Sequence, residues 1–91
     1  MDQNQGNNKM SPTFSLFLSS LSMQTLIFLG EIDNPITHKK DENLDQAKFI
    51  IDTLTMLKEK TKGNLTDHEN QMIDNILYEL RMKYTAKTGK L

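Results

Sequence analysis

Few side chains in this sequence are of the types that carry chemistry. The two histidines are His38, which precedes Lys39 and Lys40, and His68, which lies between two acidic residues in another segment. A zinc site needs three or four ligands at recognisable spacing, and the chain has no cysteine. We therefore expect no metal ion, no cofactor and no cysteine nucleophile.

Motifs for hydrolysis and phosphate binding are also missing. The serines between positions 11 and 22 have no neighbouring base, and there is no Gly-rich phosphate loop, G-x-S-x-G or H-E-x-x-H pattern. Polar groups gather around Asp33, His38, Lys39 and Lys40, which keeps a small-ligand-binding protein or enzyme accessory subunit as an alternative. The favoured prediction is that the protein is not an enzyme.

The composition limits the classes of partner and the cellular compartment that we expect. The 91 residues allow one small domain, and a net charge of −1 argues against nucleic acid as a partner. A chain without cysteine suits the reducing cytosol, so we expect a cytoplasmic protein.

The longest apolar segment runs from Met10 to Gly30, 21 residues without a charged side chain. A helix that spans a bilayer takes about 20 apolar residues, but Ser, Thr and Gln side chains interrupt this segment repeatedly. The amide-rich leader at 1–10 lacks the basic start and the cleavage site of a secretory signal. We expect a disordered leader and a buried helix, with peripheral membrane attachment through that helix as the alternative function.

This segment has two apolar sides on a helical wheel. The broad face contains Phe14, Phe17, Leu18, Leu21, Phe28 and Leu29. The opposite stripe contains Leu16, Met23 and Ile27. Either the other helices of the same chain cover both sides, or one stripe contacts another protomer. Because two short amphipathic helices rarely surround a third, we expect an oligomer.

The spacing of apolar residues and cap signals predicts an all-α fold without strands. We expect one domain at 11–86 and a frayed tail at 87–91. Three helices are expected at about 12–29, 44–62 and 67–85. A connector at 31–43, ordered or semi-ordered, joins the first two. It is long for a helix–helix connection, so it either packs through Ile32 and Ile36 or serves a function.

Helix boundaries follow from residues that satisfy free backbone groups. The expected N-caps are Ser11, Asn43 and Thr66. Glu69 should complete a capping box with Thr66. Gly30 can take the left-handed conformation that ends the first helix.

The second and third helices each have one apolar face for the core. These faces are Leu44, Ala47, Ile50, Ile51, Leu54 and Leu57, and Met72, Ile73, Ile76, Leu77, Leu80 and Tyr84. Phe49 and Met56 lie two turns apart on the other side of the second helix. Their alignment favours a further contact at that side.

Short motifs follow these predicted elements in a fixed order. They include Leu29-Gly30-Glu31-Ile32, Asn34-Pro35-Ile36-Thr37, Lys39-Lys40, Lys60-Thr61-Lys62-Gly63-Asn64-Leu65-Thr66 and Leu77-Tyr78-Glu79-Leu80-Arg81. Together they resemble a family of small bacterial proteins known only as domain of unknown function 1844. The resemblance implies a bacterial source and an all-helical domain, with no activity or catalytic residue to carry over. The family pattern leads us to expect proline in place of Asp33 and glycine in place of His38.

The sequence therefore predicts a non-enzymatic module that associates with itself or with an unidentified protein. The candidate interaction surface comprises Leu16, Met23, Ile27, Phe49, Met56, Asn34, Pro35, Lys39 and Lys40.

Overall fold

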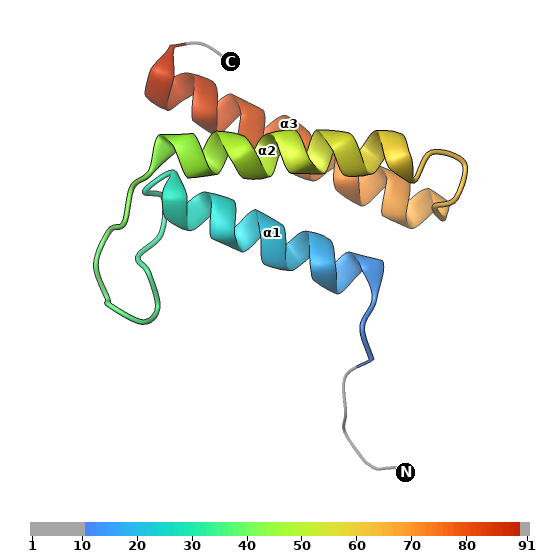
Figure 1. The fold of residues 1–91 in the computed structure, drawn as a ribbon, viewed down its shortest axis with the longest axis horizontal. Coiled ribbons are helices and arrows are strands. Elements are labelled where there is room, and N and C mark those ends of the chain that lie inside the picture. The colour runs from blue at the N-terminus through green and yellow to red at the C-terminus, as the bar shows by residue number, and fades with distance from the viewer. Residues whose placement is uncertain (1–10, 90–91) are drawn as a thin grey trace.

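The three segments with helical spacing are helices in the computed structural model, which describes residues 11–89. They are α1 (Phe14–Phe28), α2 (Leu44–Lys60) and α3 (Asp67–Thr88), shown in Figure 1. No strand occurs between residues 11 and 89, so the prediction of an all-α three-helix domain is confirmed. The leader at 1–10 and the end of the expected tail at 90–91 lie outside the described residues.

α1 begins two residues later than the sequence predicts. Its N-cap is Thr13 and not Ser11, because the Thr13 hydroxyl accepts a hydrogen bond from the Leu16 N–H at 3.0 Å. A side-chain oxygen here satisfies one of the N–H groups that no helical carbonyl reaches. Serine and threonine are both good caps, so residue type alone does not choose between these two positions.

The end of α1 is the turn that the sequence predicts. Gly30 has a φ of 77°, and its N–H donates to the Ile27 carbonyl at 3.0 Å. The N–H of Glu31 donates to the Leu26 carbonyl at 3.0 Å. These two bonds form a Schellman motif, which needs a residue in the left-handed region and therefore favours glycine.

The caps of the other two helices agree with the prediction. The Asn43 side chain accepts from the Gln46 N–H at 3.2 Å. Thr66 and Glu69 form the expected capping box, in which each side chain accepts from the backbone N–H of the other residue. Local sequence therefore determines where α2 and α3 begin.

The far ends of these helices differ from the prediction. α2 ends at Lys60, two residues early, and the chain then turns through Gly63 at a φ of 80°. α3 continues to Thr88 and stops at Gly89, whose φ is 78°. Residues 87 and 88 thus belong to the helix and are not frayed.

The helices run up, down and up, and each one contacts the other two (Figure 1). The buried apolar residues are Leu18, Leu29, Ala47, Ile50, Ile51, Leu54, Ile73, Leu77, Leu80 and Tyr84. All of them come from the apolar faces that the sequence predicts. Burial of these side chains is the main favourable contribution to folding.

Two residues of α1 depart from its predicted faces. Thr25 is completely buried, and its hydroxyl donates to the Leu21 carbonyl at 2.8 Å, so the polar group is satisfied within the helix. Phe17 was expected in the core but is 48% exposed. It lies a quarter turn from Leu18, at the rim of the buried face, because each helical residue rotates by about 100°.

None of the helices between residues 11 and 89 combines the length and the apolar character that crossing a bilayer requires.

Candidate interaction surface

The outer face of α1 carries the stripe that the sequence singles out. Leu16 is 41% exposed and Met23 is 54% exposed, whereas Ile27 is half-buried near the end of the helix. All three lie on the side of α1 away from Leu18 and Thr25, the completely buried residues of the helix. Within the chain, α2 and α3 leave the middle of the stripe uncovered.

A groove runs along one edge of this stripe, between α1 and α3. Its volume is about 530 Å³. The lining residues are Ser19, Ser22, Met23 and Leu26 of α1, and His68, Gln71, Met72, Asn75 and Ile76 of α3. Met72 and Ile76, expected in the core, are only partly buried because they line this groove. The groove lies between two helices that are far apart in the sequence, so helical spacing alone could not predict it.

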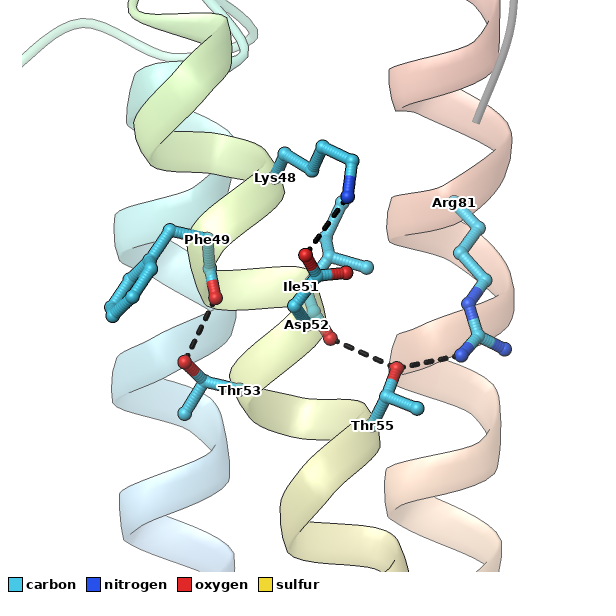
Figure 2. Close-up of polar contacts among 7 residues, drawn as sticks. All are labelled: Lys48, Phe49, Ile51, Asp52, Thr53, Thr55 and Arg81. Carbon is cyan, nitrogen blue, oxygen red and sulfur yellow. Dashed lines mark hydrogen bonds and ion pairs between the residues drawn. The ribbon is translucent and has the colours of Figure 1, made fainter.

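The opposite edge of the stripe lies beside α2. Ser22 and Leu26 lie on the flank of α1 that faces α3 across the groove. By helical spacing Phe17 lies on the opposite flank of α1, which faces α2. On α2, Phe49 is 68% exposed and Met56 is exposed as well. Figure 2 shows Phe49 on the α1 side of α2, turned away from α3. Phe49 therefore projects outward from α2 on the side nearer α1, and Met56, two turns along the helix, points in nearly the same direction.

The connector at 31–43 closes on itself around Asn34. The Asn34 N–H donates to the Lys39 carbonyl at 2.9 Å, and the Asn34 carbonyl accepts from the His38 N–H at 2.8 Å. Its side-chain oxygen accepts from the Ile36 N–H at 2.8 Å, and its amide group donates to Asp41. Asn34 is thus a structural residue of the loop, since its backbone and side chain form hydrogen bonds with other connector residues.

Ion pairs attach both ends of the connector to the last turns of α3. Lys83 pairs with Glu31 at 3.4 Å, and Lys87 pairs with Glu42 at 3.2 Å. The Asn43 N–H also donates to the Phe28 carbonyl, which holds the start of α2 against the end of α1. The connector is therefore held at its base and extends away from the three helices (Figure 1).

The tip of the connector does not pack against the domain. Ile36 is 85% exposed and Ile32 is also exposed, so the structure does not show the first of the two alternatives, in which the connector packs through these residues. Pro35, Lys39 and Lys40 are exposed too. The tip therefore presents an apolar and a basic group to the surroundings.

His38 has a φ of 60°, in the left-handed region that residues other than glycine uncommonly adopt. The family resemblance leads to the expectation of glycine at this position. The backbone gives the physical reason, since glycine adopts this conformation without strain. The His38 side chain is exposed.

A second exposed apolar area lies on the far side of the domain, between α2 and α3. Tyr78 and Met82 flank a hollow of about 630 Å³ there. Beside it, the Arg81 guanidinium donates to the Thr55 hydroxyl at 2.7 Å, and that hydroxyl donates to the Ile51 carbonyl at 3.0 Å (Figure 2). The side chains of Lys58 on α2 and Asp74 on α3 also form an ion pair. These contacts join α2 to α3.

Lys48 is a titratable group of the described residues whose pKa clearly departs from its ordinary value. The side-chain hydrogen bond to Asp52 raises the pKa of Lys48, but this pair is solvent-exposed and joins successive turns of α2. Between residues 11 and 89, no three His, Asp or Glu side chains lie together so that they could hold a metal ion.

Comparisons with known proteins give one match. A family model described as Domain of unknown function (DUF1844) matches residues 11–86. Neither the curated proteins nor the solved structures that were compared contain a match to this chain.

Proposed function

The chain belongs to the DUF1844 family, and we propose that it is a non-enzymatic module whose α1 stripe binds a second copy of the chain. The observation that carries this proposal is the exposure of Leu16 and Met23, directly opposite the buried face of the same helix. Scattered exposed apolar residues are normal on a protein surface. A helix with apolar side chains on both sides is different, because its second side has no cover within the protomer.

The lack of charge favours a second copy as the partner. From Met10 to Gly30 no side chain is charged, so two α1 stripes meet without like-charge repulsion. Removing a charged rim from water would oppose association, and α1 has no such rim. The surface is therefore electrostatically compatible with itself.

The same feature makes lipid a poorer partner. Helices that lie on membrane surfaces combine an apolar face with Lys and Arg on the polar face, which attract anionic lipids. α1 has neither residue type, and its broader apolar face is buried against α2 and α3. Peripheral membrane attachment therefore has less support than self-association.

Analytical ultracentrifugation of the full chain, over a range of concentrations, tests the proposal. We expect a reversible dimer at micromolar concentrations, and we expect Met23→Glu to weaken it at least tenfold by burying a charge in the interface. Met82→Glu is a matched control, because Met82 is a methionine on α3 with nearly the same exposure, 55%. Both side chains are exposed, so both variants should keep the helical circular dichroism of the wild type.

Two results would contradict the proposal. One is a wild-type chain that stays monomeric at the highest soluble concentration. The other is a dimer that Met82→Glu disrupts and Met23→Glu does not, because that would place the interface on the α2–α3 side.

A further inference from the structure

We infer that the two copies pair their α1 helices in antiparallel directions, with Leu16 facing the partner's Ile27 and Ser20 facing the partner's Met23. This inference rests on the proposed self-association and specifies its geometry. It is carried by the spacing of the outer residues of α1, by their sizes and by the charges at the helix ends.

The outer residues of α1 follow the spacing of a helix–helix seam. Leu16, Ser20, Met23 and Ile27 are separated by four, three and four residues. This alternation averages 3.5 residues and keeps one line of side chains facing a partner helix. Leu16, Ser20 and Met23 are exposed, and Ile27 is half-buried. The seam therefore lies on the outer face for most of its length.

The sizes of these side chains select the direction of the partner. A parallel pair places Ser20 against the partner's Ser20 and Met23 against the partner's Met23. The two small serines then leave a gap, and the two methionines crowd the next layer. An antiparallel pair places each Ser20 against a Met23, and each Leu16 against an Ile27. Large residues then meet small ones in the middle, and two branched apolar residues meet at each end, which is how facing layers interlock.

The ends of α1 favour the same direction. α1 has no acidic residue in its first turn and no basic residue in its last turn. α2 and α3 both have acidic residues at the start and basic residues at the end. α1 therefore has no charged side chain of its own that compensates the partial charges at its ends, and an antiparallel partner brings opposite ends together. A parallel partner would bring like ends together.

The contact that the α1 stripe offers on its own is small. α1 has 15 residues, so it is about 22 Å long. One stripe along a helix of this length covers less than the roughly 800 Å² that each partner buries in a standard interface. Phe17 and Phe49 along one edge, and the groove beside Met23 along the other, supply further apolar surface. We therefore expect a reversible dimer and not an obligate one.

Disulfide trapping in the full chain tests the direction, because the sequence has no cysteine of its own. Leu16→Cys and Ile27→Cys are prepared separately and oxidised mildly, alone and as an equal mixture. We expect the mixture to give crosslinked heterodimer at least fivefold above either variant alone. Ile36→Cys, at the exposed connector tip, measures the background from random collisions.

A distance measurement covers the case in which Ile27→Cys disturbs the half-buried end of α1. A spin label on Leu16→Cys alone requires only the exposed position. In an antiparallel pair the two labels are offset along the helices by 11 residues, or about 16 Å. In a parallel pair the labels lie side by side, and the crosslink of Leu16→Cys to itself becomes the dominant product.

The outcomes separate the inference from the proposal on which it rests. A dimer in which Leu16→Cys crosslinks to itself, with spin labels side by side, overturns the antiparallel geometry and leaves self-association standing. Monomeric protein by ultracentrifugation, with crosslinking no higher than for Ile36→Cys, overturns both. Heterodimer trapping together with the longer label distance supports both.

Discussion

Replacing His38 with glycine should stabilise the domain, although the substitution removes a side chain. His38 holds a φ of 60°, and its N–H donates to the Asn34 carbonyl at 2.8 Å. Glycine keeps this backbone hydrogen bond and adopts the same conformation without a steric clash. The exposed imidazole makes no contact in the core whose loss would oppose the gain.

The expected magnitude is the difference between two backbone effects. A side chain in the left-handed region costs about 1–2 kcal/mol relative to glycine. The greater freedom of glycine in the unfolded chain offsets this by about 0.4–1 kcal/mol. The central values of these two ranges leave a net gain of about 0.8 kcal/mol, which corresponds to a rise in Tm of roughly 3–6 °C for a domain of this size.

Urea unfolding followed by circular dichroism measures this gain as a higher midpoint at unchanged slope. All variants are compared at one protein concentration, because association would also raise the apparent stability. His38→Val is the control, since a β-branched residue is more strained at this φ and should lower the midpoint. Equal midpoints for glycine, valine and wild type would refute the reasoning, because the connector would then open without unfolding the helices.

Three further substitutions test the core, the turn after α1 and the α2–α3 contact. Leu54→Ala should lower the free energy of unfolding by about 2–5 kcal/mol in urea titrations, because Leu54 is completely buried among all three helices. Gly30→Ala should lower Tm by a few degrees in calorimetry, since alanine is strained at a φ of 77°. Thr55→Val should cost about 0.5–1.5 kcal/mol in urea titrations, because the Arg81 guanidinium loses its acceptor; an unchanged midpoint would show that water replaces it.

Features set by neighbouring residues could be predicted from the sequence. The caps at Asn43 and Thr66 and the turn at Gly30 depend on a few adjacent residues, and the structure has all three. The ten buried apolar residues fall on the faces that helical spacing indicated. Each of these is a local rule, in which residue type and spacing determine the backbone.

Features set by tertiary packing could not be predicted in this way. The spacing of α1 placed Phe17 in the core, but the side chain lies at the rim of the buried face and is half-exposed. Thr25 looked like an interruption of the apolar surface and is instead at the centre of the buried face. A helical wheel gives angles around one helix, and it carries no information on how far the neighbouring helices wrap around it.

The candidate surface was predicted in part. Leu16, Met23, Phe49 and Met56 are exposed, as a contact surface requires, but exposure alone identifies no partner. In the connector the sequence left two possibilities, packing or function, and the exposed Ile36 removes packing at the tip. The pairs Glu31–Lys83 and Glu42–Lys87 join residues far apart in the chain, and no sequence rule selects them among the other acids and lysines.

These two long-range pairs have a consequence for the order in which the protein folds during synthesis. The ribosome produces α1 and α2 first, but Leu80 and Tyr84, which complete the core, and Lys83 and Lys87, which fasten the connector, come from the last turns of α3. Until those turns emerge, the nascent hairpin of α1 and α2 exposes apolar surface on both sides of α1. Contact between neighbouring nascent chains is the hazard at that stage, and chaperone binding to the hairpin would prevent it.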